Sequence, residues 1–284
     1  MNEVVSHEAI WRLGPFLGLL VLMAVWELLA ARRQLRQPRL ARWSANLGIA
    51  ALNALVVRLL FPAAGVGMAL LAERREWGVF NSFEMPPAVA VPLSILLLDL
   101  AIYLQHVMFH AVPALWRLHR VHHADEDMDF TTGIRFHPVE IALSLVIKFT
   151  VIAALGPPPL AVFLFAVLLN GTSMFNHGNV RIPVGLDRLL RWVVVTPDMH
   201  RVHHSIRMPE SNSNFGFNLP WWDRLLGTYR AQPAGGHRQM VLGVDELRRP
   251  KARGLLALLV LPFVGGANRQ PISSRSSDPA HPDG

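Results

Sequence analysis

The stretch LQHVMFHAVPALWRLHRVHH, residues 104–123, ends a long apolar run and carries five histidines. Before Pro113 they stand at i and i+4, and after it at i, i+3 and i+4: His106 and His110, then His119, His122 and His123. Side chains at these spacings share one face of a helix. The pentapeptide HRVHH recurs at residues 200–204. This pattern predicts histidine clusters that meet around metal at a membrane surface.

The composition is typical of a multi-pass membrane protein, because 52% of the 284 residues are hydrophobic and only 17% are charged. There is no cysteine, which excludes disulfides, iron–sulfur clusters and thiolate metal sites. The net charge of +7 comes from basic residues that cluster in loops beside apolar segments. Such clusters are membrane-topology signals and do not form a nucleic-acid-binding stripe. We therefore expect a bilayer as partner and no nucleic acid.

Five apolar runs could cross a bilayer core of about 30 Å or line it as helices: residues 13–30, 47–72, 88–104, 139–155 and 160–175. The last two are joined by a Gly-Pro-Pro-Pro turn and form a predicted helical hairpin. Residues 31–43 carry five arginines and no acid, so the positive-inside rule makes this loop cytoplasmic. Counting from it puts every clustered histidine on the cytoplasmic side. We expect an all-α, multi-pass transmembrane helical bundle with a cytoplasmic, histidine-rich di-metal cap.

The predicted organisation has four parts. N-terminal transmembrane helices occupy residues 1–87, and a histidine-box region with the membrane hairpin (139–175) occupies residues 88–232. A C-terminal segment with a short apolar helix, on the surface or packed on the domain, covers 233–266, and residues 267–284 form a tail whose composition predicts disorder. The acidic stretch ADEDMDF, residues 124–130, is expected to be solvated.

Ten of the thirteen histidines lie between residues 106 and 204. A single histidine on an apolar face is usually a packed core residue. Ten converging imidazoles without a ligand, however, would be hard to solvate and would repel one another on protonation. His7, His237 and His281 lie in polar or terminal stretches, so we expect them to be solvated and assign them no role.

The number of clustered histidines indicates two metal ions, because eight or nine ligands exceed the octahedral limit of one. Imidazole suits iron, zinc, copper and nickel. A structural zinc site needs only four ligands and closes completely. An all-histidine pair with open positions at a membrane boundary therefore favours redox iron that binds dioxygen.

The pattern resembles the fatty acid hydroxylase, or sterol desaturase, superfamily of integral membrane non-haem di-iron enzymes. The resemblance covers roughly Asp99 to Tyr229 and rests on several motifs. They are DxxxYxxHxxxH at 99–110, HRVHH at 119–123, RFHPVE at 135–140, Asn-His at 176–177 and HRVHH at 200–204, followed by SNSNFG at 211–216 and WWDRLLGTY at 221–229. Phe215 stands where a tyrosine is common in the family.

The resemblance implies nine metal ligands: His106, His110, His119, His122, His123, His177, His200, His203 and His204. His137 is a further candidate ligand, with two alternatives, a hydrogen-bond partner of a ligand or a helix-start residue before Pro138. Asp99 lies two helical turns before His106 and would orient an imidazole, or would pair with Arg58.

Two more polar residues are assigned to the site with alternatives. Asp198 precedes His200 and is assigned the same orienting role as Asp99. Asn176 would hold a metal-bound water, or would cap a helix. The faces around Phe109, Trp116 and Phe175 are candidate walls of an apolar channel, although core packing explains any one of them.

The implied activity is a dioxygen-dependent hydroxylation or desaturation of a C–H bond in a lipid, on two iron ions (Fe2+/Fe3+). The chain has no GxGxxG after a strand, no flavin signature and no glycines after His137-Pro138 as in a haem-binding HPGG. Electrons should therefore come from an external NAD(P)H-linked donor, a cytochrome, ferredoxin or reductase. Only two of the 27 basic residues are lysine, a skew that is typical of a GC-rich bacterial genome. We therefore expect a bacterial inner membrane protein.

Three alternatives stay open. A membrane metal-binding or transport protein would thread ionisable residues along its apolar segments, whereas these histidines gather at one boundary. A zinc hydrolase would need a pairing such as HExxH, which the sequence lacks. Ether-lipid-cleaving monooxygenases and carotenoid hydroxylases share the same boxes within the superfamily.

Overall fold

The computed structural model describes residues 2–61, 64–247 and 254–265, with side chains from residue 13 onward except those of Ala64 and Glu246. No strand occurs in these ranges, and the elements are α-helices and short 3-10 helices. The predicted all-α fold is therefore confirmed. The predicted disordered tail, residues 267–284, lies outside the described residues.

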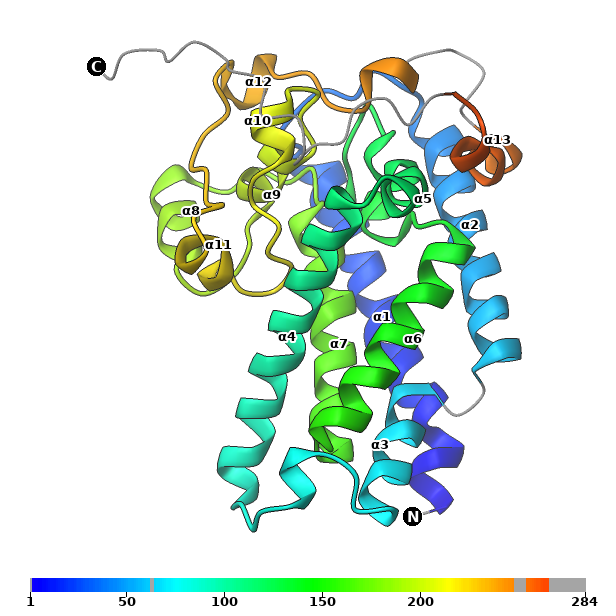
Figure 1. The fold of residues 1–284 in the computed structure, drawn as a ribbon. Coiled ribbons are helices and arrows are strands. Elements are labelled where there is room, and N and C mark those ends of the chain that lie inside the picture. Colours follow the sequence, from blue (N-terminus) through cyan, green and yellow to red (C-terminus); the bar gives the residue numbers. More distant parts are fainter. Residues whose placement is uncertain (1, 62–63, 248–253, 266–284) are drawn as a thin grey trace.

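Long helices run side by side as a bundle, and shorter ones gather at one of its ends (Figure 1). The bundle consists of α1 (Asn2–Leu29), α2 (Arg39–Leu60), α3 (Ala64–Arg74), α4 (Pro87–Ala111), α6 (Pro138–Leu155) and α7 (Pro159–Asn176). Four spans in it are long and apolar enough to cross a membrane: Arg39–Arg74, Pro87–Ala111, Pro138–Leu155 and Pro159–Asn176. A shorter apolar helix covers Leu13–Leu29. The chain is thus built as an integral membrane protein.

Proline and glycine set the ends of the bundle helices. The second apolar run, expected as one segment, contains two helices, α2 ending at Leu60 and α3 beginning at Ala64. The hairpin turns at Gly156, whose φ of 64° is left-handed. A Cβ at Gly78 would lie 2.2 Å from the backbone nitrogen of Gly156, so the hairpin turn packs closely on the segment before α4.

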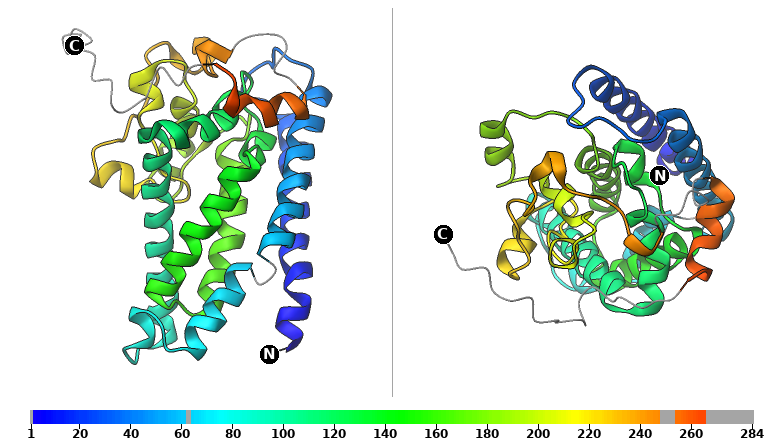
Figure 2. Two further views of the ribbon diagram at one scale, coloured as in Figure 1. Left: turned by 45° about the vertical axis from the view of Figure 1, so that its right-hand side comes forward. Right: turned by 90° about the horizontal axis from the view of Figure 1, so that it is seen from above.

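The remaining helices form a cap, and the N-terminal end of α1 lies at the opposite end of the molecule (Figure 2). The cap comprises α5 (Pro113–His123), η2 (Phe130–Ile134), α8 (Val184–Leu190), α9 (Pro197–His203), α10 (Met208–Ser211), α11 (Trp221–Leu225), α12 (Gly236–Gln239), η3 (Asp245–Leu247), α13 (Leu255–Val260) and η4 (Leu261–Phe263). Short η1 (Val79–Asn81) lies before α4. The apolar α13 packs on the domain, since Leu258 and Leu261 contact Ile49 of α2 and Val121 of α5.

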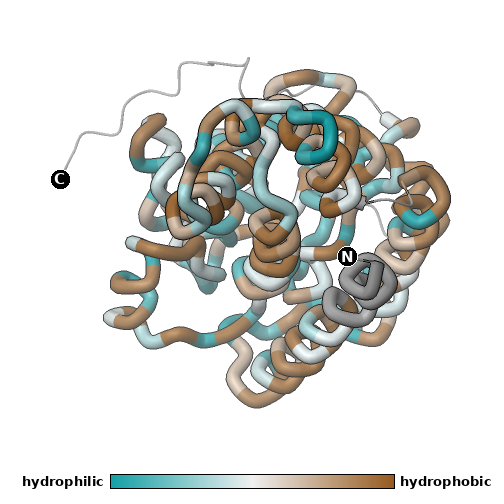
Figure 3. Tube along the Cα trace, turned by 90° about the horizontal axis from the view of Figure 1, so that it is seen from below, coloured by the Kyte–Doolittle hydropathy of each residue, from teal (hydrophilic) through white to brown (hydrophobic). Residues whose placement is uncertain are grey.

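Hydrophobic residues make up much of the bundle helices, as the backbone trace coloured by hydropathy shows from the end opposite the cap (Figure 3). Leu55, Leu59, Val89 and Val146 are large apolar residues of this kind that are exposed on the helices. A bilayer would cover such residues, whereas the polar groups of the cap would face the headgroups and water.

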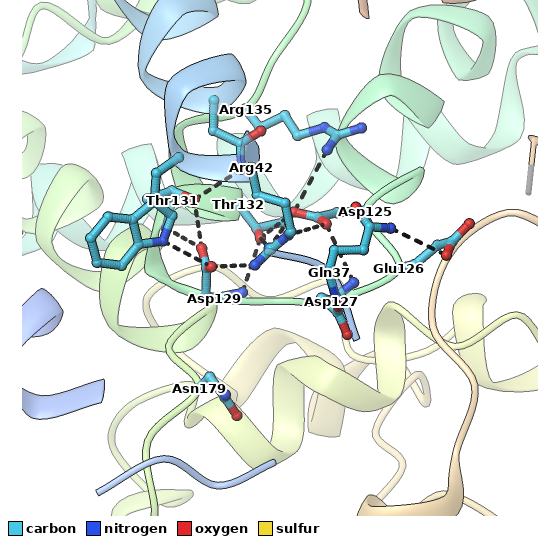
Figure 4. A network of polar contacts seen from close by, with 12 residues as sticks. Gln37, Arg42, Asp125, Glu126, Asp127, Asp129, Thr131, Thr132, Arg135 and Asn179 are labelled. Carbon is cyan, nitrogen blue, oxygen red and sulfur yellow. Dashed lines mark hydrogen bonds and ion pairs between the residues drawn. The ribbon is translucent and has the colours of Figure 1, made fainter. Parts of the chain in front are cut away.

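The prediction that the acidic stretch 124–130 is solvated is wrong. Asp125, Asp127 and Asp129 are buried, and Arg42 lies among them (Figure 4). Arg42 donates to Asp125 from Nε at 3.0 Å and from Nη2 at 2.8 Å, and it also pairs with Asp129. Asp127 accepts from the backbone N–H of Arg36 and of the next residue. Buried carboxylates require such partners, so the arginine-rich loop is fastened to the cap.

Candidate metal centre

Nine buried histidines form two compact groups at the end of the bundle that faces the cap. The first, which we call group A, contains His106, His110, His119, His123 and His203. The second, group B, contains His122, His177, His200 and His204. Within each group, one nitrogen from every ring lies within 4.8 Å of the others. The structure therefore brings together all nine histidines that the sequence singles out as ligands.

Each HRVHH pentapeptide supplies histidines to both groups: the first gives two to group A and one to group B, and the second gives one to group A and two to group B. In α5 the first and last histidines, His119 and His123, join group A, and His122 joins group B. In α9 and the residue that follows it, the middle histidine, His203, joins group A while the other two join group B. Each of these two HRVHH segments therefore supplies both groups. The HxxxH pair of α4 completes group A, and His177, directly after α7, completes group B.

In group A, three imidazoles have Nδ1 held by an acceptor. His106 Nδ1 lies 2.7 Å from the carbonyl of Phe215, and His203 Nδ1 lies 2.8 Å from the carbonyl of Ser213. His119 Nδ1 lies in the same way 2.6 Å from a carboxylate oxygen of α6. A neutral imidazole has one N–H, and these acceptors assign it to Nδ1. The Nε2 atoms of the three rings therefore carry lone pairs.

Those lone pairs point at one another. His106 Nε2 lies 3.1 Å from His119 Nε2 and 3.0 Å from His203 Nε2. Each of the three rings carries its hydrogen on Nδ1, so neither of the two Nε2–Nε2 contacts is a hydrogen bond. The facing lone pairs repel each other. Two imidazole nitrogens bound at right angles to one ion, at about 2.1 Å each, would lie about 3.0 Å apart. A cation thus fits the arrangement.

Group B repeats this geometry. His177 Nδ1 donates to the carbonyl of Ser173 at 2.6 Å, which leaves a lone pair on Nε2. That Nε2 lies 3.0 Å from His122 Nε2 and 3.1 Å from His200 Nε2. Among the nine histidines of the two groups, four have a buried Nδ1 without a hydrogen-bond partner: His110, His122, His200 and His204. His204 lacks a partner at Nε2 as well. These donors suit a metal, which needs neutral imidazole.

The electrostatics of the cap keep the rings neutral. Burial lowers the pKa of His119 and of His177 to about 3. Burial, followed by the neighbouring imidazoles, lowers the pKa of His122, His123 and His204 well below the ordinary value. Neutral imidazole is the form that binds metal.

The carboxylate beside His119 belongs to Glu140, the last residue of the RFHPVE motif, for which no role of its own was predicted from the sequence. In the structure Glu140 is buried and accepts from His119 Nδ1. The RFHPVE motif carried a signal for it, because a ligating histidine usually donates its second N–H to a carboxylate or carbonyl. The carbonyls of Ser213 and Phe215, within SNSNFG, serve the same purpose for two other rings.

Asp99 does not lie beside an imidazole or beside Arg58. Its carboxylate accepts from Asn218 Nδ2 at 2.7 Å and from Trp222 Nε1 at 2.8 Å. Asp99 therefore joins α4 to the segment that contains Phe215, whose carbonyl lies at His106 Nδ1. The sequence suggested that Asp99 contacts an imidazole directly, whereas in the structure it acts through this segment.

Asp198 points away from the histidine groups. It accepts from Arg32 Nη2 at 2.9 Å and pairs with Arg201, so it joins α9 to the loop after α1. His237, expected to be solvated, is instead buried, with Nε2 at 3.8 Å from Asp198. The polar sequence around His237 gave no sign that the C-terminal segment folds over α9.

His137 and Asn176 lie at helix ends. His137 precedes α6, where Nδ1 accepts from the backbone N–H of Val139 and Nε2 lies 3.3 Å from the carbonyl of Leu259. Backbone groups thus engage both ring nitrogens, and His137 belongs to neither histidine group. Asn176 ends α7 and donates to the carbonyl of Phe217 at 2.9 Å, while its buried Oδ1 has no partner among the described residues.

A cavity of about 580 Å³ begins at group A and extends down between the bundle helices. His106 and His119 lie at one end, and its walls come from α1, α2, α4, α6 and α7. Of the three aromatic residues proposed as channel walls, Phe109 lines this cavity. Trp116 packs on the rings of His110 and His123 instead.

Comparison with known proteins agrees with this architecture. A family model described as fatty acid hydroxylase matches residues 91–228, the range that holds all nine histidines. No solved structure matches the chain.

Three curated relatives illustrate the similarity. An ornithine lipid hydroxylase of Rhizobium tropici is 29% identical over 197 residues, which cover 69% of this chain and 56% of that protein. An alkylglycerol monooxygenase of Xenopus tropicalis is 28% identical over 65% of this chain and 41% of its own length. A cholesterol 25-hydroxylase of Mus musculus is 32% identical over 50% of this chain and 47% of its own length. The chain thus spans about half the length of the curated relatives that it matches.

Proposed function

We propose that the chain is a member of the fatty acid hydroxylase superfamily, which its family-model match and its relatives support, and that it is a membrane-bound di-iron oxidoreductase. It uses dioxygen to hydroxylate or desaturate a C–H bond of a sterol, fatty acyl or related lipid. One observation carries the proposal: nine buried imidazoles form two groups, and two of them, His106 and His119 of group A, line an apolar cavity between membrane helices.

We propose that group A and group B each hold one iron ion through the nitrogens that converge within it. Bound iron would supply the redox chemistry that activates dioxygen, and imidazole is a suitable ligand for it. The residues of the chain fix the donors. Glu140 and the carbonyls of Phe215, Ser213 and Ser173 hold Nδ1–H of four rings, so that Nε2 of each faces its group.

The surrounding side chains position the lipid and keep water out. The ligand rings are buried under α5, α9 and the segment around Phe215 and Phe217. The cavity leads from between the membrane helices to His106 and His119, so a lipid chain can approach group A without leaving an apolar environment. This arrangement separates the reacting carbon from bulk water, which would otherwise compete for activated oxygen.

We propose that the histidine end faces the cytoplasm of a bacterial cell and that the protein lies in the inner membrane. The arginine-rich loop supports this orientation, because Arg32 and Arg42 are paired with acids of the cap and positively charged loops stay cytoplasmic. Electrons would reach the centre from a separate NAD(P)H-linked protein, a cytochrome, ferredoxin or reductase, at the cap surface.

The discriminating measurement is the metal content of protein purified without oxygen, together with the lipids of cells that express it. We expect about two irons per chain and an oxidised lipid that appears only with active protein. A transport protein would change cellular metal without an oxidised lipid. Stoichiometric zinc after iron-replete growth would contradict the proposal.

Single substitutions test the two groups separately. His203→Ala removes a donor from group A and His200→Ala removes one from group B, so each should lower iron below two per chain and abolish the lipid product. His237→Gln is the matched control, because His237 is buried in the same cap but belongs to neither group. Product formation that persists in His203→Ala would remove that residue from the ligand set.

A further inference from the structure

One part of the cap carries a group of exposed apolar side chains. It consists of α8 with the turn that follows it and of α11, residues 184–195 and 221–226, and we call it the lobe. Leu189, Trp192 and Leu225 are 66%, 59% and 73% exposed. Leu186, Trp221 and Leu226 are exposed as well. Exposed apolar side chains gathered in this way mark an interaction surface, and nothing in the proposed handling of iron or dioxygen uses them.

The lobe is one unit, because its two parts hold each other. Trp221 Nε1 donates to the carbonyl of Trp192 at 2.6 Å. Arg224 Nη2 donates to the carbonyl of Arg191 at 3.1 Å. The guanidinium of Arg224 also lies over the rings of Trp192 and Tyr229, with Cζ at 4.3 Å and 4.0 Å from the ring centroids. The two helices of the lobe therefore keep a fixed relation to each other.

The lobe is also fixed beside α4, a helix long and apolar enough to cross a membrane. Asp99 of α4 accepts from Trp222 Nε1 at 2.8 Å and from Asn218 Nδ2 at 2.7 Å. At about 1.5 Å per residue, Asp99 lies about 18 Å before the end of α4 at Ala111. The start of α11 is therefore held beside the middle of α4. Figure 1 shows α8 and α11 accordingly at a lower level than α10 and α12.

The outer surface of α4 is apolar at this level. Leu104 lies between Asp99 and the end of the helix and is exposed. A bilayer that surrounds α4 would cover this leucine, because apolar side chains are favoured in a hydrocarbon environment over water. The exposed leucines of the lobe lie beside the same stretch of α4 and extend its lipid-facing surface.

The charges of the lobe suit the surface of a bilayer. Its two acids are buried, since Asp187 pairs with Arg191 and Asp223 accepts from the backbone N–H of Phe215. The exposed charges on α8 and just before it are arginines, Arg188 and Arg181. Tryptophan is enriched where a membrane meets water, and basic side chains are attracted to phospholipid headgroups. The lobe thus combines the apolar and basic residues of an interfacial element.

We propose that the lobe lies in the interfacial layer of the membrane, with its exposed leucines among the ends of the acyl chains and Arg181 and Arg188 at the headgroup phosphates. The bond to Asp99 favours lipid over a soluble protein or a second copy of the chain, because it holds the lobe where lipid would surround α4. The cap is then seated in the bilayer surface on this side. The proposal requires neither iron nor a substrate and stands apart from the proposed function.

The test measures how deeply two positions of the lobe are immersed. Because the chain has no cysteine, Leu189→Cys and Leu225→Cys can each carry a single nitroxide spin label. The full chain is placed in nanodiscs of phosphatidylcholine and phosphatidylglycerol, one chain per disc. Collisions of the label with oxygen, which is enriched in hydrocarbon, are compared with collisions with a neutral nickel chelate, which stays in water.

Two further labels provide the reference values. Leu55→Cys is exposed on α2, within a membrane span, and Gln239→Cys is exposed on α12 of the cap. We expect the oxygen-to-nickel collision ratio at both lobe positions to lie near that of Leu55→Cys and well above that of Gln239→Cys. All four positions are exposed, so the unfolding midpoints of the labelled proteins should match that of the unlabelled chain.

Three results would overturn the proposal. A ratio at both lobe positions equal to that of Gln239→Cys would place the lobe in water. Few collisions with either reagent would mean that protein covers the lobe. Nickel collisions that disappear only when two chains share one disc would assign the lobe to a contact between copies. Missing iron or a missing oxidised lipid would count against the proposed function and would leave the immersion result unchanged.

Discussion

Glu140 accepts a hydrogen bond from His119 Nδ1 across 2.6 Å, and both side chains are buried. The contact joins the first turn of α6 to α5 and therefore couples the membrane hairpin to the cap. It also fixes the tautomer of His119, so that Nε2 faces group A.

Glu140→Gln should weaken metal binding without unfolding the cap. The amide oxygen can still accept from Nδ1, but the negative charge that strengthens the ligand is lost, and loss of such partners typically costs about 10–100-fold in metal affinity. Competition with a chelator, followed by metal analysis, measures the change. Glu126→Gln is the control, since that carboxylate accepts from Gln37 at the edge of the cap. Full metal affinity in Glu140→Gln would show that the carboxylate does not support the centre.

Arg42→Leu should destabilise the protein strongly. Arg42 is buried between Asp125 and Asp129, and removing one partner of a buried ion pair leaves uncompensated charge at a cost of about 3–5 kcal/mol. The midpoint of thermal unfolding in detergent reports the loss. Arg36→Leu changes an exposed side chain of the same loop and should have little effect. Equal shifts for both variants would mean that the loop, rather than the ion pair, matters.

Gly133→Ala should disturb group B from a distance. A Cβ at Gly133 would lie 2.4 Å from the carbonyl oxygen of Ser173, which is the acceptor that orients His177. The displaced carbonyl would turn the ring, and such overpacking costs about 1–3 kcal/mol. Metal analysis should show a loss of about one ion per chain. Gly185→Ala provides the comparison, because no atom lies within 4 Å of its Cβ position.

The metal-free protein should lose stability in mild acid. Burial lowers the pKa of His119 and of His177 to about 3, against 6.5 in the unfolded chain. The unfolded state therefore binds protons more readily, and this contribution to stability is fully present above about pH 6.5 and is lost as the pH falls toward 3. Unfolding midpoints of chelator-treated protein from pH 8 to 5 measure the decline. A flat profile over that range would contradict the buried, neutral state of these rings.

Helical spacing and the order of the apolar runs were sufficient to predict that the histidine clusters gather at one boundary, whereas the set of nine ligands was implied by the family resemblance. His106 and His110 share a face of α4 through their spacing alone. The division of the HRVHH boxes between two groups could not be predicted in this way. It depends on how α5 and α9 are rotated about their axes, and tertiary packing decides that.

The residues around the ligands were harder to predict for a related reason. Asp99 and Asp198 precede histidines in the sequence, but each binds a distant segment: Asp99 binds the loop before α11, and Asp198 binds Arg32. The acidic stretch containing Asp125 is polar and looked solvated, and only the long-range approach of Arg42 accounts for its burial. Pairings over more than eighty residues have no local signature.

The reciprocal division of the two HRVHH boxes bears on how the centre is assembled. Since α5 and α9 each supply both groups, the two ions would share these two helices, and whichever ion arrives first orders donors for the other. Metal loading then becomes a joint event and not two independent ones. At limiting iron, native mass spectra should contain chains with no ion and chains with two, and few with one.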